Sequence, residues 1–433
     1  MSRLSRLRLL VGINIFWLAL SALSDGLNTL VLPARLLQMQ GETPATTLGL
    51  LTFAGLLLAM LVQPLAGQLS DRLRPRWGRR GLLAAGAALA MLGMLLLAGS
   101  ETLLLVLASY LLVQGAASVA QAAQQGFIPD LVAPEKRGAA SGVKIFMDLS
   151  GALVGFAVLG ELLRSGEIRP ALLALLAITI AALLLTLVLV REPAPEATPG
   201  GRVTLRGAFQ LDWRRHRAFV WLVGVRFLFL LGTYAVGRFL LLFVADRLGL
   251  DAGNAAAEAG RVLAVLTLVA VLPALPAGWA ADRLGRIPLM AAGSLLSAAG
   301  VLLLIWAQDE GQIMLFGSLM GLGSAAFAGA NWALTADLAP PEEAGRFFAL
   351  ANVGTGGATA AAGLFGPLVD WGNRMASGMG YTLLFVAATA AFLASLAALR
   401  PLATNQGREQ CTSEHSFRGS VQKGVVTGPE AER

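Results

Sequence analysis

The sequence is poor in charge, cysteine and histidine for its length of 433 residues. Only 14% of the residues are charged, whereas a typical soluble domain has about 25%, and 56% are hydrophobic. The single cysteine, Cys411, excludes an internal disulfide and any metal site built from cysteines alone. The two histidines, His216 and His415, lie outside the apolar segments and exclude a histidine cluster within them. A long chain of this composition is expected in a lipid bilayer.

Sequence patterns of enzymes and of ATP-driven pumps are also missing. There is no G-x-x-x-x-G-K-[ST] phosphate-binding loop and no H-E-x-x-H metal motif. We therefore expect no catalytic residue, no metal site and no cofactor, and we disfavour an intramembrane enzyme. The net charge of +7 would suggest nucleic acid as a partner of a soluble protein. Here the basic residues fall in loops between apolar runs, so no nucleic acid partner is expected.

Apolar runs long enough to cross a membrane recur about twelve times along the chain. A spanning helix needs about 20 mostly apolar residues. Such runs begin near residues 9, 46, 81, 103, 140, 170, 217, 260, 288, 312, 347 and 380. No small-residue cleavage site follows the basic N-terminus, so the first run is predicted to stay attached as a spanning helix. The sequence thus predicts an all-α membrane protein with twelve transmembrane helices.

The basic residues concentrate in alternate loops. If the N-terminus is cytoplasmic, the loops on the opposite side of the membrane hold only Arg35, Arg164, Arg169, Arg247 and Arg374. Positive charge concentrates on the cytoplasmic side of membrane proteins. We therefore expect both termini in the cytoplasm and the chain in a bacterial plasma membrane.

Two polar segments divide the chain into domains. Residues 191–216 are rich in proline, glycine and charge, and residues 401–433 are polar and expected to be disordered. We expect six-helix bundles at 1–190 and 217–400, joined by the cytoplasmic linker and followed by the cytoplasmic tail.

Two short motifs occur once in each half. The pattern G…DRL of residues 67–73 recurs at 278–284, 211 residues later, and the pattern DL…PE…G of residues 130–138 recurs at 337–345, 207 residues later. Two matches at nearly one offset indicate an internal repeat. Two parallel six-helix repeats are typical of transporters.

At these motifs the chain resembles the major facilitator superfamily, which carries G-x-L-x-D-R-x-G-R-R between helices 2 and 3. The resemblance covers residues 9–400. The longer first copy, GQLSDRLRPRWGRRG (67–81), looks like that of the glycoside–pentoside–hexuronide and sucrose-type cation symporters. Two signatures are absent: helix 2 (about 46–69) has none of the acids of sodium-dependent members, and 151–162 lacks the Gly-Pro of antiporters.

The resemblance implies a cytoplasmic gate built from the motif residues. Asp71 can pair with Arg79 or Arg80 and face the start of a helix in the other half, where an anion is favourable. A role in topology alone is the alternative. The candidate gate residues are Gly67, Asp71, Arg72, Gly78, Arg79, Arg80, Asp130, Glu135 and Arg137 in the first half, and Gly278, Asp282, Arg283, Arg286, Asp337, Glu342 and Arg346 in the second.

Polar residues inside the spans are the candidate solute and coupling sites. An ionisable group there costs about 2.5–3.5 kcal/mol on insertion scales. By the resemblance, helices 1, 4, 7 and 10 line a central cavity, and the candidate solute-binding residues on them are Trp17, Asp25, Asn28, Gln114, Gln121, Gln125, Arg226, Tyr234 and Asn331. The rings of Trp17, Tyr234 or Trp332 could stack on a sugar. The alternative is that the amides hold helices together. Arg238 and Arg261 are expected near span ends, where they can snorkel.

Lys144 and Asp148 are one helical turn apart on a face that also carries Gly151 and Gly155. They are the candidate coupling pair, with a static structural pair as the alternative.

We expect a monomeric secondary transporter whose partners are a small solute, a coupling cation (proton or sodium) and the lipid bilayer. Symport of a sugar-like solute is the first interpretation. An exporter of amphipathic or drug-like compounds, and a non-transporting sensor with the tail as its output, are the alternatives.

Overall fold

The computed structural model describes residues 3–39, 41–133, 136–192, 216–271, 283–340 and 344–402. Within these ranges the chain is helical and has no strands, and eleven helices are long and apolar enough to cross a membrane. The expected all-α membrane fold is confirmed. The run expected near residue 347 forms α15 (Ala344–Ala362), which is not among the eleven and continues through a short 3-10 turn into α16 (Gly366–Met375).

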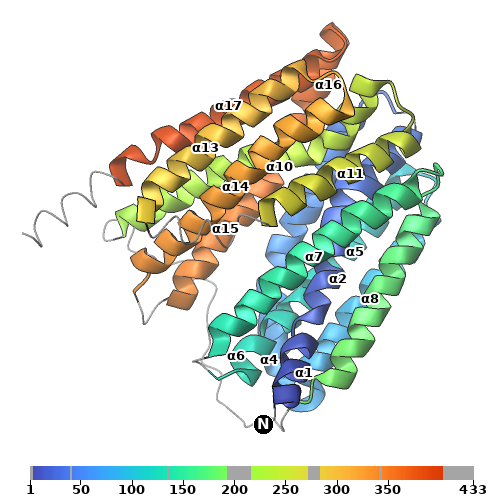
Figure 1. Cartoon of the computed structure of the whole chain (residues 1–433). Helices are drawn as coiled ribbons and strands as arrows, with labels where there is room; N and C mark the ends of the chain where they lie inside the picture. Colours follow the sequence, from blue (N-terminus) through green and yellow to red (C-terminus); the bar gives the residue numbers. More distant parts are fainter. Residues whose placement is uncertain are drawn as a thin grey trace, which may run out of the picture.

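The helices form two bundles, one from each half of the chain (Figure 1, blue to green and yellow to red). The first contains α1 (Arg3–Gly12), α2 (Ile15–Gly26), a π-helical turn (Leu27–Val31), α3 (Leu32–Gln38), α4 (Pro44–Ala98), α5 (Leu103–Gln125), α6 (Phe127–Leu131), α7 (Arg137–Leu163) and α8 (Arg169–Leu189). The second contains α10 (Arg217–Leu248), α11 (Ala252–Val271), α13 (Arg286–Leu303), α14 (Glu310–Leu338), α15, α16 and α17 (Met379–Ala397).

Two boundaries differ from the sequence prediction. The run expected to begin near residue 260 begins at Ala252, because the carboxylate of Asp251 accepts the backbone N–H groups of Gly253 and Asn254 and caps the helix there. The charged stretch expected as a loop between helices 2 and 3 is helical. It belongs to α4, which breaks only at Gly78, where φ is 65°.

The internal repeat is visible in how equivalent helices pack. In the first bundle, a Cβ at Gly86 would lie 2.6 Å from the backbone nitrogen of Ala120 on α5. In the second, a Cβ at Gly293 would lie 2.9 Å from the backbone nitrogen of Phe327 on α14. Each residue of the first pair is 207 positions before its counterpart. The same small residues therefore bring the same two helices together in both halves.

Small residues also allow close contact between helices within the first bundle. A side chain at Gly151 would overlap the backbone of Leu18, and a Cβ at Gly155 would lie 3.1 Å from the Cα of Ala22, both on α2. The two glycines thus let α7 and the first spanning helix approach closely, which positions Lys144 beside α2.

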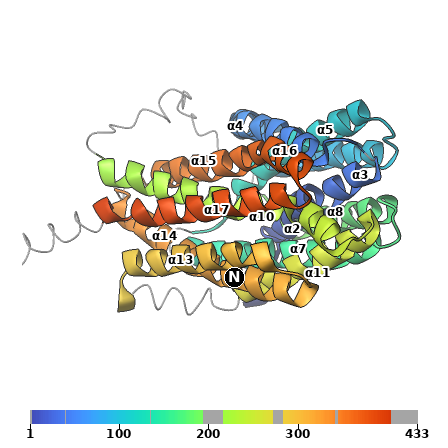
Figure 2. The same ribbon diagram turned by 90° about the horizontal axis from the view of Figure 1, so that it is seen from above.

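The two bundles meet at the end of the molecule opposite α1, which we call the far end. There a Cβ at Gly160 of α7 would lie 2.9 Å from the Cα of Gly260 on α11, and a Cβ at Gly49 of α4 would overlap the carbonyl of Gly363. Figure 2 shows these neighbours from opposite bundles, α7 beside α11 and α4 beside α16. Toward the near end, which holds α1, the bundles splay apart (Figure 1).

Candidate functional site

The two copies of the charged motif form equivalent ion pairs at the near end. Arg79 Nε lies 2.5 Å from Asp130 Oδ2, and Arg286 pairs with Asp337 in the second half. Each residue of the first pair lies 207 positions before its counterpart. Each of these two ion pairs lies within its own bundle and holds helices of that bundle together.

A carboxylate just beyond the end of α8 caps the break in α4. Gly78 and its repeat equivalent Gly285 both have positive φ, 65° and 88°, which favours glycine. Beyond Gly78 the helix restarts, and the carboxylate of Glu192 accepts the backbone N–H of Arg79 (2.9 Å) and of Arg80 (2.8 Å). Sequence reasoning missed Glu192, because nothing in its neighbourhood reveals a partner more than 100 residues away.

Several predicted gate residues lie outside the described part of the structure. These are Glu135, Gly278, Asp282 and Glu342, together with the side chains of Asp71, Arg72 and Arg346. Gly67 lies within α4, and Arg283 is exposed. Arg137 donates to the carbonyl oxygens of Pro129 (2.9 Å) and Val132 (3.2 Å) and so caps the end of α6.

Charged side chains of the first bundle gather on α2 and α7. Lys144 Nζ lies 2.7 Å from Asp148 Oδ2 and 4.0 Å from the ring centroid of Trp17. Asp25 is near enough to Asp148 for their charges to interact. The π-helical turn Leu27–Val31 begins two residues after Asp25, and such turns are frequent at functional sites. The Lys144–Asp148 ion pair is therefore present and adjoins Trp17, a predicted solute-binding residue, and its role in coupling stays a prediction.

Arg226 is the centre of a buried polar group in the second bundle. It lies on α10, is 7% exposed, and donates through Nε to Thr355 Oγ1 (2.9 Å) and through Nη1 to Asn331 Oδ1 (2.6 Å). Its guanidinium carbon lies 3.9 Å from the ring centroid of Trp332. Sequence reasoning selected Arg226, Asn331 and Trp332 separately, and the structure brings them together with Thr355.

Arg238 is a second buried arginine of α10. It is 4% exposed and donates to the carbonyl of Thr359 (3.3 Å). It lies near enough to Asp25 and Tyr110 of the first bundle, and to Tyr234 on its own helix, for their charges to influence one another. The expectation that Arg238 snorkels near a span end is wrong, because α10 continues well past it and the side chain is buried.

The predicted amides differ in their surroundings. Asn28 and Gln114 are buried, Gln121 is half-buried and Gln125 is exposed. Asn28 Oδ1 accepts from the hydroxyl of Tyr110 at 2.7 Å. Gln124, the repeat equivalent of Asn331, donates to the backbone of Ile13 at 2.7 Å. These two contacts hold helices of the first bundle together.

A carboxylate of the second bundle caps a helix of the first at the far end. Asp370 of α16 accepts the backbone N–H of Thr46 (2.6 Å) and of Ala45 (3.3 Å) at the start of α4. An anion is favourable at a helix N-terminus. Asp370 was not selected from the sequence, although an acid beside an apolar run is a signal that points to such residues.

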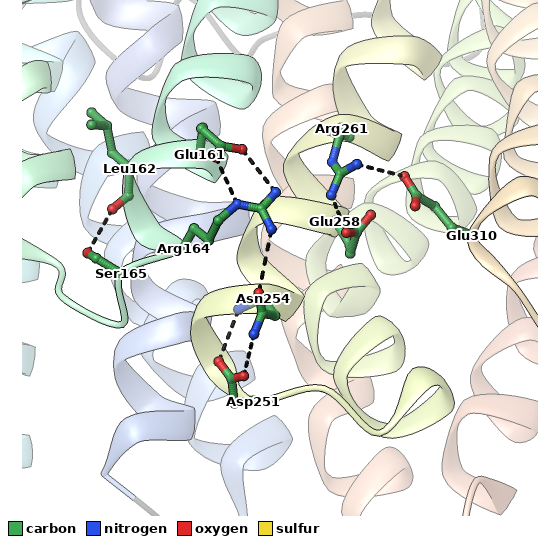
Figure 3. Close-up of polar contacts among 9 residues, drawn as sticks. All are labelled: Glu161, Leu162, Arg164, Ser165, Asp251, Asn254, Glu258, Arg261 and Glu310. Atoms are coloured by element: carbon green, nitrogen blue, oxygen red, sulfur yellow. Dashed lines mark hydrogen bonds and ion pairs between the residues drawn. The ribbon is translucent and has the colours of Figure 1, made fainter.

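Polar side chains also cross between the bundles at the far end (Figure 3). Arg164 forms two contacts with Glu161, at 2.8 and 3.0 Å, and donates to Asn254 Oδ1 of the other bundle at 3.5 Å. The backbone and side-chain N–H groups of Asn254 donate to Asp251 and hold the pKa of that carboxyl below its ordinary value. These contacts form a solvent-accessible rim around the closed far end.

Arg261 also lies at this rim and differs from its prediction. It is midway along α11, not near a span end, and its guanidinium pairs with Glu258 and lies 3.8 Å from Glu310 (Figure 3). Two carboxylates therefore compensate the charge of Arg261, so its side chain does not need to snorkel to the membrane surface.

A family-level comparison covers most of the chain. The family model described as Major Facilitator Superfamily matches residues 10–273 and 253–423. The chain belongs to the major facilitator superfamily. It is therefore an integral membrane protein and a transporter, not an enzyme.

Individual relatives match shorter segments. The multidrug resistance protein MdtH of Cronobacter sakazakii is 33% identical over 160 residues, which are 37% of this chain and 39% of that protein. The protein of the same name from Yersinia pestis is 33% identical over 123 residues, 28% of this chain and 30% of that protein. The chain thus spans well under half the length of the curated relatives it matches.

Solved structures share the fold over nearly the whole chain. A bacterial homologue of the human lysosomal transporter Spinster, inward-facing and occupied, has a TM-score of 0.74 at 14% identity and covers 93% of this chain and 98% of its own. The nucleoside transporter NupG has a TM-score of 0.70 at 13% identity, with 91% and 98% covered. At such identities the likeness concerns the fold alone.

Proposed function

We propose that the chain is a cation-coupled transporter that moves a small organic solute by alternating access. The cation site lies in the inter-bundle cluster, which we define as Asp25, Lys144, Asp148 and Arg238, and the solute site includes Arg226 on the same helix as Arg238. The observation that carries this proposal is that both bundles hold charged side chains within their spans: the Lys144–Asp148 pair in the first, and the buried Arg226 and Arg238 in the second, with Arg238 close enough to Asp25 for their charges to influence each other. Charges shared by two bundles change their energy when the bundles move apart, so a ligand or cation that alters these charges can bias the movement.

The arrangement of the bundles supports an inward-facing state. The far end is closed and the bundles splay toward α1 (Figure 1). With the N-terminus in the cytoplasm, as the distribution of arginines favours, the open end faces the cytoplasm. In the opposite state the contacts of Asp370 and Arg164 with the other bundle would have to break, and the near ends, with the gate motif, would close.

Coupling is assigned to Asp148 and Asp25. A proton or sodium ion that binds Asp148 would release Lys144, which could then pair with another acid. Asp25 accepts a hydrogen bond from Ser21 (2.9 Å), and its charge and that of Asp148 are close enough to influence each other, so we assign Asp25 as the acid with which the released Lys144 would pair. The rival interpretation is a static structural pair between two half-buried side chains.

A sugar-like solute is the first candidate for transport. Hydroxyl and amide groups of Tyr234, Gln121 and Thr359 offer hydrogen bonds on helices next to the cluster. Trp17 and Trp332 give this candidate less support. The charged ends of Lys144 and Arg226 cover one face of their rings, so that face is not open to stack on a sugar.

Export of amphipathic compounds is the second candidate. The partial similarity to multidrug resistance proteins favours it. In that case the same cluster would couple cation entry to solute exit.

The test uses purified protein in liposomes with an imposed pH or sodium gradient. Radiolabelled sugars, sugar acids, aromatic acids and amphipathic cations are offered in turn, and empty liposomes serve as the control. We expect the cation gradient to drive accumulation of at least one solute, and Asp148→Asn to exchange that solute without accumulating it. Accumulation that survives in Asp148→Asn contradicts the coupling assignment, and no gradient-driven movement of any solute contradicts the proposed function.

A sensor that does not transport is tested by removing the tail. Residues 401–433 are mostly outside the described ranges. A transporter keeps its flux when they are deleted, whereas a sensor has no flux in either form.

A further inference from the structure

We infer that the transported solute carries an acidic group, a carboxylate or a phosphate, which binds to Arg226. This inference rests on the proposed function and specifies the chemistry of its solute. It assigns Arg226, with Asn331 beside it and Trp332 beneath it, as the anion site of the second bundle.

The charge of Arg226 is buried among neutral partners. Its hydrogen bonds go to a threonine hydroxyl and an asparagine carbonyl. Across the described residues, the ion pairs within 4.0 Å do not include Arg226. A buried charge is costly unless it is paired, and the cost inside a membrane makes such residues functional by default. A solute anion would supply the missing counter-charge.

A hydrogen-bond donor beside Arg226, the side-chain amide of Asn331, lacks a partner. Asn331 is fully buried, and its Oδ1 is engaged by Arg226, but its Nδ2 has no hydrogen-bond partner among the described residues. The unused hydrogen-bonding capacity at this place is therefore that of donors. Carboxylates and phosphates are acceptors, and arginine binds both with two parallel hydrogen bonds. Neutral sugars offer hydroxyls and organic cations offer donors, so both fit this pair less well.

Arg238 has a different role. It lies about 18 Å from Arg226 along the axis of α10, so one small acidic group contacts one arginine at a time. The charges of Arg238 and of Asp25 in the other bundle are close enough to influence each other, so we assign Arg238 to the coupling residues. Arg226, whose partners are all neutral, is the anion site.

The test measures the thermal stability of the full-length protein in detergent with matched pairs of probes. The pairs are glucuronate with glucose, salicylate with salicylamide, and phenyl phosphate with phenol. We expect at least one acid to raise the unfolding temperature in a concentration-dependent way, and its neutral partner to have no such effect. If every acid acts no better than its neutral partner, the inference is wrong.

Variants locate the effect. Arg226→Gln should weaken the binding of that acid roughly tenfold or more, as expected for a hydrogen bond to a charged group. Arg226→Lys should keep part of the affinity, and Arg169→Gln, an exposed arginine outside the cluster, should keep all of it. Unchanged affinity in Arg226→Gln overturns the inference.

Asn331→Asp provides a test that does not require the loss of Arg226. It places a carboxylate 2.6 Å from Arg226 Nη1 in the position of the amide oxygen, so the protein supplies its own counter-charge. We expect a folded protein that is at least as stable as the wild type and no longer binds the acid. Undiminished binding in Asn331→Asp contradicts the inference.

The outcomes separate this inference from the proposed function. If neutral sugars or organic cations are transported and acids neither bind nor move, the acidic solute is wrong and the transporter stands. If acids bind through Arg226 but no solute crosses the liposome membrane, the anion site stands and the proposed function is wrong.

Discussion

Adding one methyl group at Gly260 should shift the transporter away from the state in which its far end is closed. A Cβ at this position would lie 2.6 Å from the carbonyl oxygen of Phe156 and 2.8 Å from the Cα of Gly160, both in the other bundle. Both neighbours are backbone atoms, which cannot turn aside. To restore a 3.4 Å contact, α7 and α11 must separate by about 0.8 Å.

The expected size of this shift follows from the cost of overpacking. Forcing extra atoms into a packed site costs about 1–3 kcal/mol, which corresponds to a change of about 5- to 150-fold in the ratio of the two states. The closed far end should therefore become the minor state in Gly260→Ala if the two states are within about 1 kcal/mol of each other in the wild type.

Distances between spin labels report this shift without a known solute. The labels are attached to Arg169→Cys and Arg374→Cys, which are exposed at the far end on opposite bundles, in a protein whose only native cysteine is replaced by Cys411→Ser. Gly260→Ala should add a longer distance to the distribution. Gly224→Ala, where a Cβ meets no atom within 4 Å among the described residues, should not. Identical distributions in Gly260→Ala and the wild type would refute the reasoning.

Two further substitutions test the near end. Asp71→Asn should leave membrane insertion intact and slow transport severely, because its position in the motif assigns it to the charge-dependent gate; normal transport by a well-expressed variant would reduce the motif to a topology signal. Glu192→Gln should lower the unfolding temperature, since it removes the charge that caps Arg79 and Arg80 and a helix cap contributes about 0.5–2 kcal/mol; the same change at exposed Glu167 is the control, and an equal effect of both would contradict the capping role.

The sequence was sufficient to predict the helices and the repeat. Apolar runs of about 20 residues and one-sided arginines are local signals, and they indicated an all-α membrane protein with a boundary between residues 190 and 217. The nearly equal offsets of the two motifs, 211 and 207 residues, also predicted that Asp130 and Asp337 occupy equivalent places. This holds in the structure, where each pairs with the arginine that follows a glycine of positive φ.

Contacts between distant helices could not be predicted in the same way. The partner of Arg79 depends on how α4 packs against α5, and the partner of Asp370 depends on how the two bundles meet. The burial of Arg238 depends on the length of α10, which exceeds the minimum for a span. Each of these facts is set by tertiary packing, whereas periodicity and composition report only on one segment at a time.

The central claim is that the far end opens and closes during transport, and a reversible crosslink across it tests this most directly. Arg164 is exposed, Asn254 is half-buried, and the two come from opposite bundles with their side chains 3.5 Å apart (Figure 3). Arg164→Cys with Asn254→Cys in the Cys411→Ser protein should therefore be joined by a short thiol crosslinker that attaches through disulfide bonds and is removed by reduction. Movement of the solute identified in liposomes should fall to the level of empty liposomes when the pair is joined, and return after reduction. Transport at the uncrosslinked rate by fully crosslinked protein would contradict the account.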